Sequence, residues 1–503
     1  MNHHDQALRL IGELASLGIN AGHATADSRA VRPGDIFLAY PGLRGDGRNY
    51  IADAIARGAI AVLWEREGYA WKREHSIANL PCDGLQAISG EFASQIYGEP
   101  SRHLRLVGVT GTNGKTSTTQ WLARAYQSLH QRCGVIGTLG AGFPGQEFEA
   151  TANTTPDAVT LQSLLYQFVG AGAKAAAIEV SSIGLEQGRL DGAAFDTAVF
   201  TNLTRDHLDY HHTMEAYARA KARLFTWPKL RAAVINLDDA VGMDLATDCS
   251  QRLPLTIGYT LGESLEHLPS GLRVLAAANV RGTNTGMSFD VLWSGQRNEL
   301  NVTLVGRFNV ANLLAVIGTL LAGGISFDDA CDAACGLSSL PGRMQIVGGV
   351  MEPLAVIDYA HTPDALEQAL CALRPTANGR GGRLVCVFGC GGDRDPGKRP
   401  LMGATATRLA DRVIVTSDNP RGEDPATIIA DILAGTEPRA ASLLDRAAAI
   451  EDAVLHAADD DVVLIAGKGH EPYQEIAGVR HPFSDAEHAR DALRLRGKSG
   501  GRA

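Results

Sequence analysis

One turn dominates this chain: Leu104-Arg-Leu-Val-Gly-Val-Thr-Gly-Thr-Asn-Gly-Lys-Thr-Ser117. An apolar run typical of a strand ends at Val109, and a helical pattern runs from Thr116 to His130. In such a turn the backbone N–H groups and the positive end of the helix form a concave site for phosphate oxygens. Lys115 is placed to reach terminal phosphates, and the Thr116 hydroxyl to hold Mg²⁺. We therefore predict a phosphate-binding loop with these members: Gly111, Thr112, Asn113, Gly114, Lys115 and Thr116.

The loop departs from the strict P-loop pattern at one position. That pattern has a glycine six residues before the lysine, where this chain has Val109. The mismatch indicates a P-loop variant rather than a generic nucleoside triphosphatase. A GTP-binding switch protein is further disfavoured because the chain lacks an Asn-Lys-x-Asp guanine motif.

Length and composition indicate a globular chain of about three domains. The chain has 503 residues, of which 45% are hydrophobic and 20% charged. It has neither an apolar run of the ~20 residues that span a bilayer nor the start of a signal peptide. The eight cysteines are scattered, and the pairs Cys331/Cys335 and Cys386/Cys390 suggest packing rather than metal binding. We expect a cytoplasmic monomer without membrane insertion.

The formal net charge of −10 argues against nucleic acid as a partner. An anionic small molecule could still bind where Arg, Lys and backbone N–H groups gather. Such local clusters are therefore the candidate sites.

Two linkers divide the chain into three α/β blocks. They are Gly98-Glu-Pro-Ser-Arg102 and Ser338-Ser-Leu-Pro-Gly342. The predicted domains are residues 1–98, 99–337 and 338–503. In the first block, Gly34–Tyr40 and Ala59–Leu63 are expected to be strands.

In the second block, several apolar runs end in a polar segment. After the run to Val109 come Ala175–Ile178 before Glu179-Val-Ser-Ser182, Thr197–Phe200 before Thr201–Asp209, and Ala232–Ile235 before Asn236–Asp239. Helical stretches between these runs indicate a largely parallel sheet. Because the carboxyl ends of parallel strands share one edge, we expect these polar segments to converge on one site.

The third block repeats this pattern. Its predicted strands, each with the polar loop that follows, are Arg383–Phe388 before Gly389–Arg394, Asp411–Val415 before Thr416–Arg421, and Asp461–Ile465 before Ala466–Glu471. Arg394 occupies the third glycine position of a dinucleotide fingerprint, so we predict a doubly wound, Rossmann-like block without a nicotinamide cofactor. Loops that carry both cations and carboxylates suit a zwitterionic or polyanionic ligand.

Ten motifs, in order along nearly the whole chain, resemble those of the Mur ligases, in particular the MurE type. They are Asp27-Ser-Arg29 with Pro33–Phe37, Gly111–Thr116, Asn153–Pro156, Glu179–Ser182, Arg205–Tyr210, Gly306–Asn309, Asp358–Pro363, Gly391–Arg394, Asp418–Arg421 and Gly467–Glu471. The resemblance implies three domains: an N-terminal one for a UDP-sugar, a central ATPase and a C-terminal one for an amino acid. It also implies ATP-dependent amide formation in peptidoglycan biosynthesis. In that reaction the γ-phosphate passes to the D-glutamate γ-carboxylate of UDP-N-acetylmuramoyl-L-alanyl-D-glutamate, and an amine then attacks the acyl phosphate.

The resemblance also implies roles for individual residues. Catalysis and Mg²⁺ binding are assigned to Lys115, Thr116, Glu179, His207 and Lys221, the last as a carbamate formed with CO₂. The rest of the ATP site is assigned to Asn309, Arg343, Asp358 and His361. The UDP-muramoyl dipeptide is assigned to Ser28, Thr154, Thr155, Ser181, Gln187 and Arg189. Two positions depart from the family pattern: Ile183, where histidine is common, and His212, where glycine is usual.

The amino acid is expected to be meso-diaminopimelate, because Asp418-Asn-Pro-Arg421 resembles the form found in enzymes that use it. Arg421 and Arg394 could grip the distal carboxylate, which lysine lacks, by bidentate pairing. The full set assigned to the amino acid is Arg394, Asp418, Asn419, Pro420, Arg421, Gly467 and Glu471, with Glu471 suited to its ammonium group.

Three alternatives remain open. A lysine-adding ligase of the same family is disfavoured by Arg421. Folylpolyglutamate synthetase shares the ATP core but lacks the first block with Asp27-Ser-Arg29. A non-catalytic binding module is disfavoured because four residues are retained together: Lys115, Glu179, His207 and Lys221.

Overall fold

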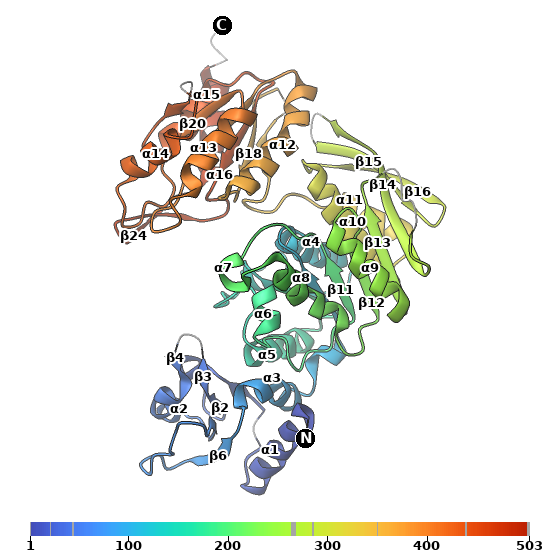
Figure 1. The fold of residues 1–503 in the computed structure, drawn as a ribbon, viewed down its shortest axis with the longest axis vertical. Coiled ribbons are helices and arrows are strands. Elements are labelled where there is room, and N and C mark those ends of the chain that lie inside the picture. The colour runs from blue at the N-terminus through green and yellow to red at the C-terminus, as the bar shows by residue number, and fades with distance from the viewer. Residues whose placement is uncertain are drawn as a thin grey trace. The chain divides into compact units, whose positions relative to one another are not determined.

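The computed structural model describes residues 2–20, 22–42, 45–262, 268–283, 286–349, 351–437 and 440–499 (Figure 1). The chain forms two compact units. Unit 1 comprises Met1–Ala276 and Ala311–Ala334, and unit 2 comprises Ala277–Val310 and Cys335–Ala503. Within the described ranges no helix is both long and apolar enough to cross a membrane.

Unit 1 begins with a small parallel sheet. Its strands, in spatial order, are β1 (Ala24–Thr25), β2 (Ile36–Ala39), β5 (Ala61–Glu65) and β6 (Ala78–Cys82). The helices of this region are α1 (His3–Ser16), α2 (Ile51–Ala56) and α3 (Leu85–Ile96). Two short antiparallel strands, β3 (Pro41–Gly42) and β4 (Gly45–Asp46), follow β2 in the sequence. Leu10, Leu63 and Phe92 are buried together in its core. The two strands predicted here are thus confirmed, with β5 ending two residues later than expected.

The large sheet of unit 1 carries the phosphate loop. In spatial order its strands are β14 (Leu272–Thr283), β13 (Leu255–Thr260), β12 (Ala232–Asn236), β11 (Thr197–Phe200), β7 (Arg105–Thr110), β10 (Ala175–Glu179), β8 (Cys133–Gly137) and β9 (Gly140–Gly142). All neighbours pair in parallel except β8 and β9. The helices are α4 (Lys115–Ser128), α5 (Ala158–Gly170), α6 (Ser182–Glu186), α7 (Leu208–His211), α8 (Met214–Ala222), α9 (Ala240–Arg252), α10 (Arg307–Ala322) and α11 (Phe327–Cys335). Residues 277–283 of β14, part of α10 and the last residue of α11 belong to unit 2, where the sheet continues from β14 to two further strands, β15 (Gly286–Trp293) and β16 (Gln296–Val302).

The register of this sheet brings the polar segments together. Val109 of β7 pairs with Glu179 of β10, and Thr110 pairs with Phe200 of β11. The residues that follow β7, β10 and β11 therefore leave the same edge of the sheet side by side. This confirms the convergence that the sequence predicts.

Unit 2 is built around a six-stranded sheet. Its spatial order is β17 (Gln345–Gly348), β18 (Leu354–Asp358), β22 (Val462–Ala466), β19 (Leu384–Phe388), β20 (Arg412–Val415) and β21 (Ala441–Ser442), in which only β17 is antiparallel. The helices are α12 (Pro363–Arg380), α13 (Lys398–Leu409), α14 (Pro425–Leu433), α15 (Arg446–Leu455) and α16 (Asp485–Ser499). Two hairpins complete the unit: β15 (Gly286–Trp293) with β16 (Gln296–Val302), and β23 (Tyr473–Ile476) with β24 (Val479–Pro482).

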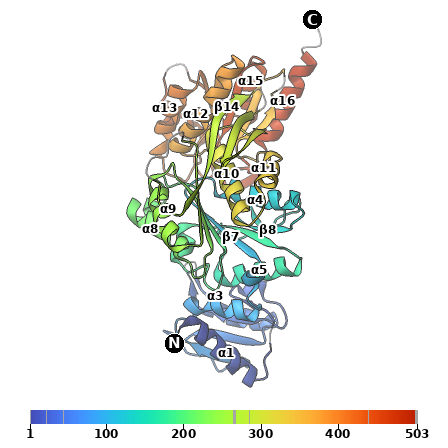
Figure 2. The same ribbon diagram turned by 90° about the vertical axis from the view of Figure 1, so that its right-hand side faces the viewer.

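Helices cover both faces of this second sheet, as a doubly wound fold requires. Figure 2 shows α12 and α13 on one side, and α15 and α16 on the other. One buried cluster contains Leu370 of α12 and Met402 of α13, and a separate cluster contains Ile450 of α15 and Ala489 of α16. The alternating side chains of each strand therefore feed two cores, which explains the continuous apolar runs of the third block.

Candidate active site

The phosphate loop has the backbone of an anion-binding turn. Gly111 and Gly114 have φ angles of +148° and +86°. A β-carbon on Gly111 would overlap the hydroxyl oxygen of Thr201, and one on Gly114 would overlap the side chain of Asn312. Only glycine fits both positions, so the sharp turn ahead of α4 requires a glycine at each of them.

The segment after β11 holds this loop in place. The N–H of Asn113 donates to Asn202 Oδ1 at 2.9 Å, and the N–H of Thr112 donates to the Asn202 carbonyl at 2.9 Å. The Thr201 hydroxyl donates to the Asn113 carbonyl at 2.6 Å. These bonds preorganise the loop before any ligand arrives.

Lys115 lies folded against its own loop. Its Nζ donates to the carbonyls of Gly111 and Thr112 at 2.8 and 2.9 Å. The ammonium group is therefore held at the mouth of the loop, where the sequence predicts phosphate contacts.

Glu179 and Thr116 meet at the carboxyl ends of β10 and β7. The Thr116 hydroxyl donates to Glu179 Oε2 at 3.0 Å. Glu179 is 1% exposed and also accepts hydrogen bonds from Thr138, at 2.9 Å from the N–H and 3.1 Å from the hydroxyl. Hydroxyl and carboxylate oxygens are the hard ligands that Mg²⁺ prefers, so this pair fits the predicted metal.

Lys221 of α8 is buried beside the same loop. It is 1% exposed, and its Nζ donates to the Gly111 carbonyl at 2.8 Å and lies 4.3 Å from the Tyr217 ring centroid. Burial lowers the pKa of the Lys221 ammonium well below its usual value, and the charge of Lys115 lowers it further, while Asp206 opposes the shift. The side chain therefore favours the neutral amine, the form that can add to CO₂.

His207, another predicted metal ligand, has a solvent-exposed side chain. It has a φ of +52°, its side chain is 47% exposed, and its Nε2 lies 3.5 Å from Asp206 Oδ2. Among the described residues no three His, Cys, Asp or Glu side chains gather as a metal-binding group. The predicted set needs only Glu179 and His207 of these types, because a threonine hydroxyl and a lysine carbamate supply its other members.

Five of the six residues predicted for the UDP-muramoyl dipeptide form a connected group. Thr155 Oγ1 lies 3.0 Å from Ser181 Oγ, and Arg189 donates to the Thr155 carbonyl at 2.9 Å and to Gln187 Oε1 at 2.6 and 2.9 Å. Thr154 lies next to them, 3.2 Å from the Thr138 hydroxyl.

Ser28 is the sixth of these residues, and none of the hydrogen bonds above includes it. It is buried in a short helix of the N-terminal region, Ser28–Ala30, whose N-cap is Asp27.

The residues predicted for the nucleotide lie on unit 2. Asn309 donates to the Val305 carbonyl at 2.8 Å, and His361 Nδ1 lies 2.8 Å from the Tyr359 carbonyl oxygen. The Asp358 carboxylate accepts the N–H groups of Met344 and Ala360 at 2.8 and 2.9 Å.

Arg343 is the member of this group with an unmet donor. Its guanidinium lies 4.9 Å from the Tyr359 ring centroid. Within the described part of the chain its buried Nε has no hydrogen-bond partner. A buried donor without a partner is costly, and a ligand could satisfy it.

The loops predicted to bind the amino acid converge at the carboxyl ends of β19, β20 and β22. Arg421 Nη1 donates to the Gly392 carbonyl at 2.8 Å. A β-carbon on Gly391 would lie 2.8 Å from Arg421 Nη1 and 3.8 Å from Arg394 Cγ, so both arginines border this glycine. Asn419 donates to Glu471 Oε2 at 2.7 Å.

Asp418 and Gly467 are buried and lie in close contact in these loops. Gly467 has a φ of +117°, and a β-carbon there would overlap the Asp418 carboxylate. Burial raises the pKa of the Asp418 carboxyl, against the charges of Arg446 and Lys468. Pro420, the remaining residue of the set, is buried between Asn419 and Arg421 in the same loop.

Three family models of the Mur ligases match this chain in order. The Mur ligase family catalytic domain matches residues 23–97, the Mur ligase middle domain residues 109–320, and the glutamate ligase domain residues 342–469. A UDP-N-acetylmuramoyl-L-alanyl-D-glutamate–2,6-diaminopimelate ligase of Janthinobacterium sp. (strain Marseille) is 52% identical over 95% of this chain and 96% of its own. The chain belongs to the Mur ligase family.

Two further comparisons agree with this membership. A ligase of the same name from Chromobacterium violaceum is 51% identical over 96% of this chain and 97% of its own. The solved structure of another such ligase superposes with a TM-score of 0.70 at 40% identity, covering 95% of each chain. This Mur ligase therefore has the three-domain α/β fold that the sequence predicts, and it is an ATP-dependent, amide-forming enzyme.

Two residues of this Mur ligase depart from the family pattern, His212 and Ile183. His212 has a φ of +64°, a conformation that glycine adopts without strain and histidine only at a cost. Ile183 lies within α6, where the adjacent Ser182 hydroxyl lies 2.8 Å from Nε2 of the buried His211. That contact joins α6 to α7, and sequence reasoning missed it because neither residue stands out alone.

Proposed function

We propose that this chain adds meso-2,6-diaminopimelate to UDP-N-acetylmuramoyl-L-alanyl-D-glutamate, with ATP, during peptidoglycan biosynthesis. The observation that carries this proposal is the pair Arg394 and Arg421 beside Gly391, in a chain 52% identical to a ligase named for that reaction. A guanidinium group can pair with a carboxylate through two hydrogen bonds, and the distal carboxylate distinguishes diaminopimelate from lysine.

The reaction begins with transfer of the γ-phosphate of ATP to the γ-carboxylate of the D-glutamate. The N–H groups at the start of α4 and the ammonium group of Lys115 would neutralise the anionic oxygens during this transfer. The amine of diaminopimelate then attacks the acyl carbon, the C–N bond forms, and phosphate leaves with the C–O electron pair. The amine loses its proton, and the products are an amide, ADP and phosphate.

Mg²⁺ would be held by Thr116, Glu179, His207 and the carbamate of Lys221. The ion, when bound, supplies positive charge opposite the phosphate oxygens. The carbamate requires the neutral amine of Lys221 to form an N–C bond to CO₂ and to release a proton. The burial of Lys221 and its contact with a carbonyl rather than a carboxylate support that step.

ATP is assigned to the loop Gly111–Thr116 together with Asn309, Arg343, Asp358 and His361. The unmet donor of Arg343 and its position over Tyr359 support a role in holding the nucleotide. The UDP-muramoyl dipeptide is assigned to Ser28 and to the group around Arg189. In that group the guanidinium is already braced by Gln187 and Thr155 and needs little reordering to meet an anion.

The three substrates correspond to the three predicted domains. We assign the UDP-sugar to residues 1–98, ATP to 99–337 and the amino acid to 338–503. The monomeric state and the cytoplasmic location stay predictions from the sequence.

The proposed function is tested by measuring phosphate release in four mixtures. Each contains the protein, ATP, Mg²⁺ and the UDP-muramoyl dipeptide, and the additions are none, meso-diaminopimelate, L-lysine or both. We expect release with diaminopimelate, little with lysine, and almost none without an amino acid. Equal release without an amino acid would contradict the ligase assignment, and release with lysine alone would favour a lysine-adding enzyme.

A further inference from the structure

Lys468 is a fully buried lysine that none of the roles above uses. It lies in the loop after β22 and has an exposed fraction of 0%. Its Nζ donates to Asn419 Oδ1 at 2.8 Å and to Glu471 Oε2 at 3.3 Å. One ammonium group therefore joins the two loops that are assigned to the amino acid.

The contacts around Lys468 set the orientation of Asn419. Its Oδ1 accepts hydrogen bonds from Lys468 and from the N–H of Glu475, at 2.9 Å for the latter. With the oxygen held by two donors, the amide nitrogen faces Glu471 and donates to its Oε2 at 2.7 Å. The amide cannot turn over without losing all three bonds.

The same contacts leave one oxygen of Glu471 open. Both donors, Lys468 and Asn419, reach Oε2, and no other described residue donates to Oε1. The Glu471 side chain is 19% exposed. A carboxylate with one oxygen anchored and one presented outward suits an incoming ammonium group.

Arg446, a second buried cation of this region, pairs with Asp485 and not with Glu471. Arg446 forms a two-bond pair with Asp485 at 2.7 Å for each bond, and both side chains are 0% exposed. Lys468 is thus the cation in contact with Glu471, and its loss would leave that anchored oxygen with Asn419 alone.

The network also reaches the arginine end of the site. Glu475, whose N–H donates to Asn419, accepts a hydrogen bond from the N–H of Arg421 through its carbonyl at 3.0 Å. The N–H of Ala477 donates to the Arg421 carbonyl at 2.7 Å. The hairpin β23–β24 therefore connects the Glu471 end to the Arg421 end.

We infer that Lys468 is a positioning residue for the amino acid substrate, and that it acts by orienting Asn419 and Glu471 toward the substrate's ammonium group. The inference rests on the proposed function. Lys468 itself stays beneath the site and does not touch the substrate. Loss of Lys468 is therefore expected to raise the KM for the amino acid and to leave the binding of ATP unchanged.

The test replaces Lys468 by methionine, which keeps length and removes the donors. We expect the KM for diaminopimelate to rise about 10-fold. The substitution removes the charge-assisted hydrogen bond that orients Glu471, and the loss of one such bond has an effect of this order. The KM for ATP and for the UDP-muramoyl dipeptide stays at the wild-type value. Lys468→Gln keeps N–H donors and is expected to recover part of the effect.

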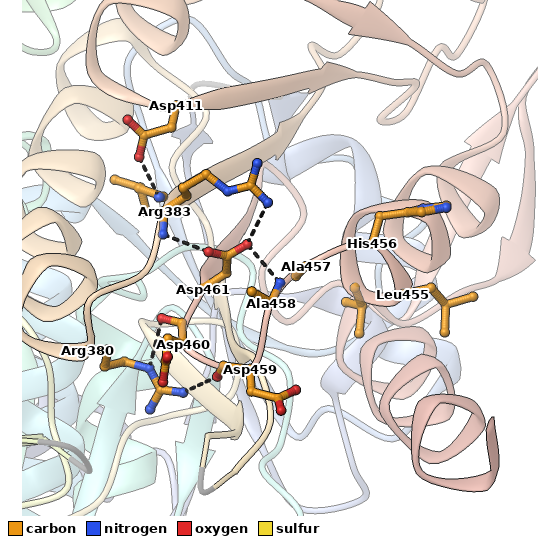
Figure 3. Close-up of polar contacts among 12 residues, drawn as sticks. Arg380, Arg383, Asp411, Leu455, His456, Ala457, Ala458, Asp459, Asp460 and Asp461 are labelled. Atoms are coloured by element: carbon orange, nitrogen blue, oxygen red, sulfur yellow. Dashed lines mark hydrogen bonds and ion pairs between the residues drawn. The ribbon is translucent and has the colours of Figure 1, made fainter. Parts of the chain in front are cut away.

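A matched control comes from the other end of β22. Figure 3 shows Asp461, whose carboxylate accepts hydrogen bonds from the N–H of Arg383 at 2.7 Å, the Arg383 guanidinium at 3.2 Å and the N–H of Ala458 at 2.9 Å. Asp461→Asn disturbs a buried polar group directly before the same strand, at the end opposite the carboxyl-end loops. It is expected to lower the melting temperature without changing the KM for diaminopimelate.

A double-mutant cycle with Glu471→Gln tests whether Lys468 acts through Glu471. We expect the double variant to raise the KM by less than the product of the two single effects. Wild-type KM in both Lys468 variants, an equal rise for all three substrates, or full additivity would overturn the inference. Failure of the wild-type protein to use diaminopimelate would instead overturn the proposed function.

Discussion

Each of the two units contains a buried lysine near the carboxyl ends of its parallel strands, and the surroundings of these two lysines differ. Lys221 in unit 1 contacts a backbone carbonyl and an aromatic ring, and Lys115 lies near enough to oppose its charge. Lys468 in unit 2 contacts the carboxylate of Glu471 and the amide oxygen of Asn419. Burial lowers the pKa of both ammonium groups, but only Lys468 has a carboxylate in contact to oppose the shift.

The difference between these two sets of contacts shows that burial alone does not determine the role of a lysine. Without a contacting counter-ion, the amine of Lys221 is driven toward its neutral, nucleophilic form, as carbamate formation requires. With acceptors on two loops, Lys468 serves as a cross-link between them. The predictions below test this contrast.

The largest effect is expected for Lys221→Met. Loss of the carbamate removes one of the groups assigned to Mg²⁺, so kcat should fall about 10³-fold, as when other preorganised charge-stabilising groups are removed. Steady-state phosphate release measures it. The control is Lys229→Met, an exposed lysine, which should keep wild-type kcat. Wild-type turnover in Lys221→Met would end the carbamate assignment.

A smaller effect, confined to one substrate, is expected for Arg421→Ala. Its guanidinium is assigned to the distal carboxylate, so the KM for diaminopimelate should rise about 100-fold and the KM for ATP much less. Initial rates at varied concentrations of each substrate separate the two. Arg408→Ala, which removes an exposed arginine paired with Glu367, is the control. Unchanged diaminopimelate kinetics would remove Arg421 from the site.

The two buried lysines should differ in sign when stability is measured. Lys221→Met removes an amine that must lose its proton when the chain folds, while the Gly111 carbonyl keeps its bond from Lys115, so the free energy of unfolding should rise by roughly 1–2 kcal/mol. Lys468→Met leaves Glu471 short of a donor and should lower it by roughly 1–3 kcal/mol. Denaturant titration of both variants measures the changes. The same sign for both would break the comparison.

The smallest effect is the pH dependence of the Lys221 contribution. Its folded-state pKa is below the unfolded value of 10.5, so the unfolded state binds more protons between the two values. The lysine therefore costs stability at neutral pH, and this cost disappears as the pH rises toward 10.5. The stability gap between Lys221→Met and wild type should shrink from pH 7 to pH 10 in CO₂-free buffer containing EDTA. A constant gap would contradict a lowered pKa.

Much of the fold was predictable because buried parallel strands are short apolar runs followed by polar loops. Every such run in the second and third blocks became a parallel strand, from β7 to β22. The antiparallel strands carry less of this signal. β16 pairs antiparallel with β15, and its sequence, Gln296-Arg-Asn-Glu-Leu-Asn-Val302, is mostly polar and exposed, so no apolar run marks it.

The hairpin β23–β24 escaped prediction for a related reason. Its strands are mostly exposed and polar, so hydrophobic periodicity does not reveal them. Its turn residues, Ala477 and Gly478, have φ angles of +50° and +78°. This is the backbone of a two-residue hairpin, but alanine stands where Asn or Asp would have indicated the turn.

The sequence predicts which polar segments lie side by side at the sheet edge, and it does not predict the individual contacts between their side chains. The motifs placed Thr116 beside Glu179, and Arg394 beside Arg421, through strand-end convergence. The supporting contacts of Thr138 and Lys468 depend on side-chain directions that spacing does not specify. Their roles became visible only through the hydrogen bonds to Glu179 and Glu471.

The central claim is that the Gly111–Thr116 loop delivers phosphate to a carboxylate rather than to water. We would label the γ-carboxylate of the D-glutamate in the UDP-muramoyl dipeptide with ¹⁸O, run the reaction with ATP and diaminopimelate in ordinary water, and analyse the released phosphate by mass spectrometry. The account predicts one ¹⁸O atom in each phosphate, because the carboxylate oxygen leaves with it. Phosphate free of ¹⁸O, formed alongside the amide product, would contradict it.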